Sequence, residues 1–192
     1  WIQPTTGTSD YYNTCADGTA AGVPDNGAGC QMDISPDESY AGIFLGALCQ
    51  GPPPAGGNYV EYIQQKMVSA MIPGIKYFLQ INVSLAELTN SGYADGMEVY
   101  LSNDQITAEN FNIFPVAASL KLTATELLND ESKWVKICGT YTATGGEQWI
   151  TIGNFGGIAF TNSGIISSTG CSVVTILHRH AISFTIILMM FR

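Results

Sequence analysis

The chain has 192 residues, of which 46% are hydrophobic, 10% aromatic and only 12% charged, with 21 glycines and a formal net charge of −9. This length and composition predict one folded β domain with its own core and argue against disorder. The negative charge argues against nucleic acid and anionic membrane surfaces as partners, because a protein that binds either needs clustered Lys and Arg.

The elements are predicted from turn signals and from alternating apolar residues. Residues 1–58 are expected to be largely irregular, with one short buried strand inside them. Residues 59–72 fit helical spacing and strand alternation alike, and we favour a strand followed by a crossing loop, because Pro73-Gly74 then opens a clear strand. A longer connection with one helical turn at 123–128 is expected between the later strands. Strands are predicted at residues 39–45, 59–64, 75–84, 97–102, 134–141 and 148–155.

The last two runs flank a Thr/Gly-rich turn, and we interpret them as a hairpin. Short strands at this spacing, long Gly-rich loops and no long helix predict an all-β fold, an antiparallel β-sandwich of jelly-roll type.

Cysteine content and the first residue bear on the compartment. Five cysteines fit an oxidising compartment better than the cytosol. Cys15 and Cys30 bracket a Gly/Asp/Pro-rich loop and are the predicted disulfide, although all five thiols reduced and buried is the alternative. No CxxC or neighbouring His supports zinc, so no metal site is predicted. The sequence starts at Trp1, and we interpret this as the first residue of a secreted or cell-surface protein from which a signal peptide has been removed.

Several sequence words carry a resemblance to a known family. In order along the chain, they are residues 4–13, Cys15, residues 39–43, 59–64, 74–77, 83–86, 96–102 and the closing run 134–155. Together they resemble the carbohydrate-binding-module-like jelly-roll domain of secreted and outer-membrane surface proteins of gliding bacteria. The resemblance implies a lectin-like surface β-sandwich, with sugar binding by analogy. By the same analogy a structural calcium is conceivable at Asp10, Asp33 and Asp130; no other cofactor is expected.

The C-terminal segment departs from that pattern, so we divide the chain into a jelly roll over 1–172 and an apolar segment over 173–192. The family tends to end in Tyr-Tyr-Ile-Asp-Asp-Val, which is absent here. Codons that encode residues 176–180 can also encode Tyr-Tyr-Ile-Asp when they are read one nucleotide later. One hypothesis is therefore that the sequence after about Thr169 is a frameshifted reading of the expected last strand. Otherwise the apolar run 181–191, too short to span a bilayer as a helix, is the domain's own last strand or a strand donated to a neighbouring subunit.

Catalysis is not predicted. The only histidines are His178 and His180, so a Ser-His-Asp or Cys-His arrangement lacks a dependable base. The adjacent acids Asp37-Glu38 and Asp130-Glu131 would point to opposite faces of a strand, which suits glycoside cleavage poorly. Glycine-rich phosphate loops are absent.

Sugar binding needs an exposed aromatic face beside polar groups. The candidates are Trp149, Tyr141, Tyr100 and Tyr93, with Glu147 as a polar partner. The alternative for each aromatic residue is a place in the core or at its rim. Two functions are therefore carried forward: a self-assembling subunit of an extracellular filament or surface matrix, with copies of itself as partners, and a carbohydrate-binding adhesion module with glycans as partners.

Overall fold

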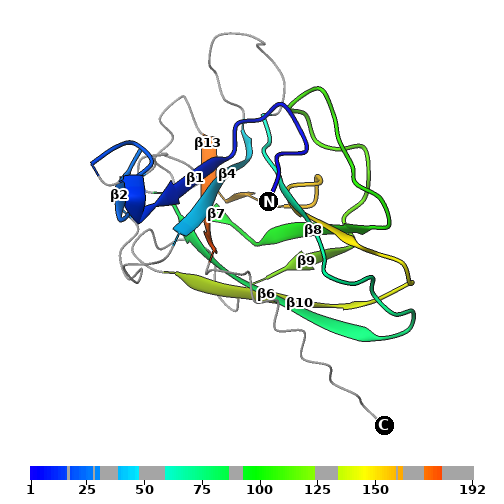
Figure 1. The fold of residues 1–192 in the computed structure, drawn as a ribbon. Helices are drawn as coiled ribbons and strands as arrows, with labels where there is room; N and C mark the ends of the chain where they lie inside the picture. The colour runs from blue at the N-terminus through cyan, green and yellow to red at the C-terminus, as the bar shows by residue number, and fades with distance from the viewer. Residues whose placement is uncertain are drawn as a thin grey trace.

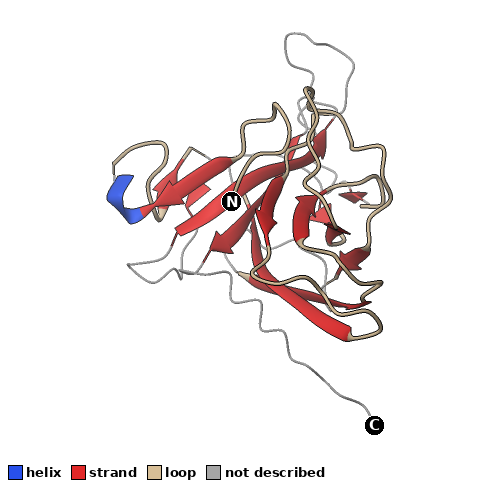
Figure 2. Ribbon diagram, turned by 45° about the vertical axis from the view of Figure 1, so that its right-hand side comes forward, coloured by secondary structure: helices blue, strands red, loops and turns tan. Residues whose placement is uncertain are grey.

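The computed structural model describes residues 1–16, 18–27, 29–30, 39–47, 59–86, 93–123, 134–158, 160–161 and 171–178. Within them the chain forms antiparallel strands and a single 3-10 turn (Figures 1 and 2), so the all-β prediction is confirmed for this part of the chain. The elements are β1 (Asp10–Asn13), η1 (Thr14–Ala16), β2 (Asp25–Asn26), β3 (Gly29–Cys30), β4 (Ser39–Ala47), β5 (Ile63–Lys66), β6 (Lys76–Leu85), β7 (Tyr93–Ala94), β8 (Met97–Ser102), β9 (Leu120–Leu122), β10 (Val135–Thr142), β11 (Trp149–Gly153), β12 (Phe160–Thr161) and β13 (Cys171–His178).

Two main sheets contain most of these strands. The five-stranded sheet has the order β1-β4-β13-β6-β10, and the four-stranded sheet has the order β5-β11-β8-β9. Two short pairs, β12-β7 and β2-β3, complete the strand pairing. At one side β9 also reaches the larger sheet, because the backbones of Thr123 and Cys138 form a β-bridge.

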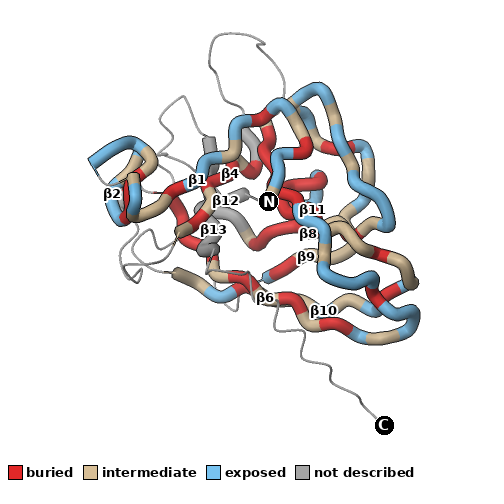
Figure 3. The backbone as a smooth tube through the Cα atoms, viewed as in Figure 1, coloured by how far each residue is buried: buried red, intermediate tan, exposed pale blue. Residues whose placement is uncertain are grey.

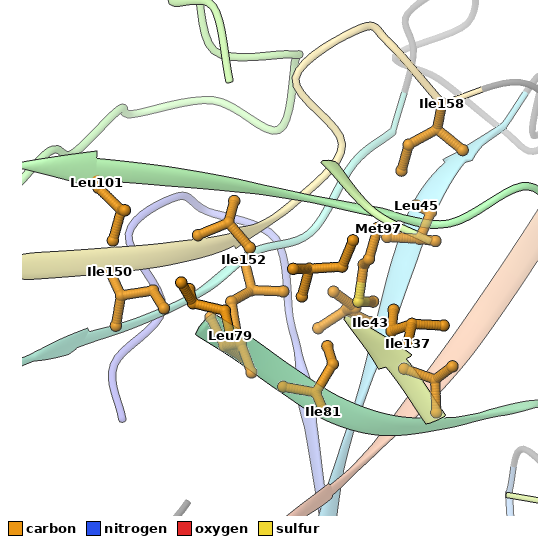
Figure 4. Packing of buried hydrophobic residues seen from close by; sticks show 14 of the residues in the cluster. Ile43, Leu45, Leu79, Ile81, Met97, Leu101, Ile137, Ile150, Ile152 and Ile158 are labelled. Carbon is orange, nitrogen blue, oxygen red and sulfur yellow. The ribbon is translucent and has the colours of Figure 1, made fainter. Parts of the chain in front are cut away.

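The core lies between the two main sheets. Strand β6 alternates as its sequence predicts, with Tyr77, Leu79, Ile81 and Val83 buried. The same apolar cluster takes residues from both sheets, and Figure 4 shows those of β4 and β6 in contact with those of β8 and β11. Burial of this shared face, traced in red along the strands of Figure 3, is the main stabilising term of the fold.

A second apolar cluster lies on the other face of the four-stranded sheet. Tyr62, Phe114 and Phe155 pack there, with ring centroids 4.8 Å apart for Tyr62–Phe114 and 5.1 Å for Tyr62–Phe155. Residues 103–119 supply the cover, which explains why the middle of β11 is buried on both faces. Gly153 is required where this layer is tight, because a Cβ there would come within 2.3 Å of the Tyr62 ring.

Most predicted strands are present with shifted ends. The predictions at 39–45, 75–84, 97–102, 134–141 and 148–155 correspond to β4, β6, β8, β10 and β11. The run 59–64 forms a strand only from Ile63, since Val60 and Tyr62 pack into the second cluster. The first 30 residues contain three short strands where irregular chain was expected. The helical turn expected at 123–128 falls, after Thr123, outside the described residues.

The predicted hairpin is wrong. Strand β10 pairs with β6, whereas β11 pairs with β5 and β8, so the two runs belong to different sheets. The turn between them contains Gly145 and Gly146, both at positive φ (104° and 93°), and it carries the chain from one sheet to the other. Apolar runs on both sides of a turn do not distinguish a hairpin from such a crossing, because both need the same turn residues.

Strand β13 lies in the middle of the larger sheet. It pairs with β4 from Cys171 to His178 and with β6 over Val174–Ile176. The strand therefore crosses the expected boundary between residues 172 and 173. The run 181–191, predicted as the domain's own last strand or as a donated strand, lies outside the described residues.

Candidate functional site

One corner of the molecule brings together several of the predicted ligand residues, and we define it as residues 66–75 and 141–149. Backbone hydrogen bonds join its two segments: Met67 N donates to Gln148 O (2.7 Å), Met71 N to Glu147 O (2.8 Å) and Gly146 N to Met71 O (3.1 Å). Gly74 N donates to Ala143 O over 2.8 Å. These hydrogen bonds give the loop after β5 a defined shape, although the loop contains no helix or strand.

Glu147 holds the crossing turn together. Its side chain is only 2% exposed, and its carboxylate accepts hydrogen bonds from Thr144 N and Oγ1 (both 2.7 Å), Gly145 N (2.8 Å) and Tyr141 Oη (2.8 Å). Burial alone would raise the pKa of Glu147, but the hydrogen bonds from Thr144 and Tyr141 outweigh it and lower the pKa to about 2. Both oxygens are therefore engaged by the protein itself, which leaves the carboxylate little to offer a ligand.

Trp149 lies at the rim of the corner, in a row across three strands. Its Cα partners are Lys66 on β5 and Ser102 on β8, and residues paired in this way project to one face of the sheet. The Lys66 ammonium lies 6.0 Å from the centroid of the Trp149 ring. Lys66 is exposed, and Trp149 and Ser102 are half-buried. We call this row the Trp149 platform; it combines an aromatic ring, a cation and a hydroxyl.

The loop after β5 exposes apolar side chains. Val68 is fully exposed and Ile72 is 61% exposed, whereas Met71 between them is buried beside Ala143 in the main core. Ala70 and Pro73 are exposed as well. Isolated surface apolar residues are common, but Val68 and Ile72 lie on one short loop that backbone hydrogen bonds hold in place. We call these two exposed side chains the apolar knob. Sequence reasoning did not select it, although the run Met67-Val68-Ser69-Ala70-Met71-Ile72 has more apolar residues than a solvated loop needs.

Two cations border the apolar knob. Lys66 precedes the loop and Lys76 follows it, both are exposed, and no acid stands between them in the sequence. Within the described residues the one ion pair joins Lys121 to Asp95, so neither Lys66 nor Lys76 is neutralised there. Glu147 is the acid of the corner itself, and its charge is taken up by the turn. Residues 66–76 therefore carry two exposed cations and no acid, in a chain whose net charge is −9.

The remaining predicted sugar-binding aromatics are dispersed. Tyr141 is half-buried against the main core and donates to Glu147, so it belongs to the turn's support. Tyr100 packs at the second cluster, with its ring centroid 5.8 Å from that of Phe155. Tyr93 is in β7, opposite Thr161 of β12, and its side chain lies outside what is described. The structure thus places Trp149, Tyr141 and Glu147 in the corner and Tyr100 and Tyr93 elsewhere; all five remain predictions as ligand residues.

The predicted disulfide and calcium ligands fall at the other end of the chain. Cys15 is an exposed free thiol, and the side chain of Cys30 is not among those described, so the pairing stays a prediction. Asp10 is exposed and accepts a hydrogen bond from Tyr12 Oη at 3.1 Å, while Asp33 and Asp130 lie outside the described residues. Within the described part of the chain, no three His, Cys, Asp or Glu side chains are grouped so as to hold a metal ion.

Two further buried carboxylates serve the fold, and sequence reasoning did not select them. Glu61 accepts from Phe44 N (2.9 Å), Thr8 N (3.0 Å) and Tyr59 Oη (2.8 Å). Burial raises the pKa of Glu61, and the hydrogen bonds from Phe44 and Tyr59 oppose that rise. Glu98 accepts from Phe155 N (2.6 Å) and Gly157 N (3.1 Å), which anchors the loop after β11. Each carboxylate ties loop N–H groups to a strand.

Comparisons with known proteins identify no family. No protein-family model matches the chain, and no curated protein matches it. Among solved structures, the chain is similar to the K3 cleaved adhesin domain of Lys-gingipain from Porphyromonas gingivalis, with 12% identity over 88% of this chain and 89% of that one, at a TM-score of 0.39. A TM-score this low does not establish a shared topology. In the described residues, no helix is long and apolar enough to cross a membrane.

Proposed function

We propose that this chain is a non-catalytic, exported bacterial surface protein with a jelly-roll sandwich fold, and that it acts as a self-assembling subunit of an extracellular filament or matrix. The observation that carries the proposal is the apolar knob, in which Val68 is fully exposed and Ile72 is 61% exposed. Covering such side chains on association removes apolar surface from water.

The geometry of the loop makes the knob suited to binding. Backbone hydrogen bonds from Met67, Met71 and Gly74 to the crossing turn hold it in one shape, so association costs little ordering entropy. Low charge density works in the same direction, because only 12% of residues are charged and few charges must be desolvated at an interface.

A role without catalysis is supported by the state of the buried acids. Glu61, Glu98 and Glu147 each accept hydrogen bonds from backbone N–H groups of neighbouring loops, those of Thr8, Phe155 and Thr144. A carboxylate that acts as a general acid or base needs a free lone pair facing substrate, together with a pKa near the working pH. These three side chains instead satisfy orphan backbone donors, which is a structural role.

Self-association tests the proposal directly. Sedimentation velocity over a concentration series, with electron microscopy of the same samples, should show oligomers or filaments of the intact chain. Val68→Asp should weaken association at least about tenfold, since burying one valine is worth about 1.5 kcal/mol or more. Thr107→Asp, a charge added at another exposed loop, is the matched control and should change nothing. A chain that stays monomeric at every concentration contradicts the proposal.

A second candidate function, glycan binding in adhesion, is favoured by the Trp149 platform. A pyranose places its C–H face on an indole ring and its hydroxyls on neighbouring polar groups, and Lys66 and Ser102 flank this ring. Glycan-array binding that Trp149→Ala abolishes, and that Tyr11→Ala at an exposed aromatic elsewhere leaves intact, would establish it. An array with no bound sugar would remove this candidate.

A further inference from the structure

We infer that the apolar knob docks onto the acidic N-terminal end of a second copy of this chain, so that subunits join head to tail. The inference rests on the proposed self-assembly and names the two surfaces that would meet. One is the knob with its cations, Lys66 and Lys76. The other is the end formed by β1, η1 and the β2-β3 pair, which we call the acidic end.

The acidic end has the complementary charge. Residues 1–65 contain seven acids and no Lys or Arg. Of the acids described there, Asp10 and Asp25 are exposed, whereas Glu61 is buried. Tyr11 is 59% exposed beside Asp10 and offers an apolar surface with a polar tip. A positive apolar knob and a negative surface with an exposed aromatic ring are complementary in both charge and polarity.

The two surfaces lie at opposite ends of the molecule. In Figures 1 and 2 the β1-η1-β2 region projects at one end, and the loop from β5 to β6 projects at the other. A contact between different surfaces is heterologous and generates an open chain of subunits or a ring, whereas a contact between identical surfaces stops at a dimer. Opposite placement therefore makes this pair of surfaces suitable for a filament.

Like charges argue against other pairings of these surfaces. Two knobs facing each other would bring Lys66 and Lys76 against the same residues of the neighbour, and two acidic ends would oppose Asp10 and Asp25 in the same way. In the head-to-tail pairing, the cations of each knob face the carboxylates of the neighbouring acidic end, so the charge interaction is attractive. Association should consequently weaken as salt is raised, because exposed charges are screened.

Charge reversal with rescue tests the inference in the intact chain. Lys66→Glu with Lys76→Glu reverses the knob, and Asp25→Lys with Asp10→Asn reverses the acidic end; asparagine keeps an acceptor for Tyr12. Each pair alone should weaken association at least about tenfold in sedimentation velocity, which is the loss expected for about 1.4 kcal/mol. A mixture of the two variants should associate again, because the reversed knob of one chain matches the reversed end of the other and their unmodified knob and end also match. The chain with all four changes should likewise assemble. Circular dichroism and thermal melting confirm that each variant is folded.

The outcomes separate this inference from the proposed function. Association that persists in all variants would overturn the head-to-tail surfaces and leave self-assembly standing. Absence of association in the unmodified chain would overturn both. Loss of association in both pairs without recovery in the fourfold variant would refute charge complementarity. Binding of the unmodified chain to neutral phosphatidylcholine vesicles, lost in Val68→Asp, would assign the knob to a lipid surface and overturn the inference.

Discussion

The carboxylate of Glu147 gives the sharpest quantitative prediction, because the structure names each donor that it binds. Replacing it by glutamine leaves one acceptor oxygen and turns the other into an NH₂ group. That group would face N–H donors of Thr144 or Gly145, with which it cannot form a hydrogen bond. The turn that carries the chain between the sheets would then hold a buried, unmatched donor.

The magnitude follows from the pKa of Glu147, which falls from 4.5 to about 2 on folding. Each pH unit between these two values is worth about 1.4 kcal/mol, so the ionised form gains at most about 3.5 kcal/mol. We expect Glu147→Gln to lower the free energy of unfolding at pH 7 by about 2–3 kcal/mol. For a chain of this size the melting temperature should fall by about 4–12 °C.

The pH dependence has a definite sign. A pKa lowered by folding contributes stability above the unfolded value, near 4.5, and this contribution is lost as the pH falls towards about 2. The difference between the unmodified chain and Glu147→Gln should therefore be constant from pH 7 to about 5 and should shrink steadily below that. Urea unfolding followed by tryptophan fluorescence measures it, with Glu109→Gln, at an exposed acid, as the control. A difference below about 0.5 kcal/mol at pH 7, or one that is unchanged at pH 3, would refute the reasoning.

Three further outcomes are expected. Gly153→Ala should destabilise the fold by about 2 kcal/mol or more in the same assay, because the added Cβ would come within 2.3 Å of Tyr62; Gly74→Ala has open space but a positive φ of 77°, so it should cost only about 1 kcal/mol. A chain ending before Cys171 should lose its cooperative unfolding transition, because β13 pairs with both β4 and β6 and its removal would divide the larger sheet. Cys15 should react with a maleimide in the native protein, because its thiol is exposed and free; resistance that dithiothreitol relieves would contradict this and indicate the Cys15–Cys30 disulfide.

Alternation in the sequence was sufficient to locate strands but not their partners. The pattern of Tyr77, Leu79, Ile81 and Val83 predicts β6 almost to its ends, because the side-chain period of a strand is local. Pairing is not local. β11 follows β10 after a short turn, yet it finds β5 and β8 in the other sheet, since the two left-handed glycines and the Glu147 carboxylate redirect the chain.

The candidate site was only partly predictable for a related reason. Trp149 alternates with the buried Ile150, and this local pattern favours the face opposite the main core, where Trp149 is half-buried. Glu147 was predicted as a polar partner for a sugar, but its side chain folds back onto N–H groups of its own turn. The exposure of Val68 and Ile72 depends on Met71 entering the core between them, and that choice is made by tertiary packing.

The two candidate functions share one residue, and this determines which variants can separate them. Lys66 borders the apolar knob and also lies 6.0 Å from the Trp149 ring, so reversing its charge would disturb self-association and sugar binding together. Val68 belongs to the knob, and Trp149 belongs to the platform. Loss of assembly in Val68→Asp with sugar binding retained assigns the corner to self-association, and the opposite pattern in Trp149→Ala assigns it to glycans. Because removing β13 would split the larger sheet, point changes on this surface are more informative than shortening the chain.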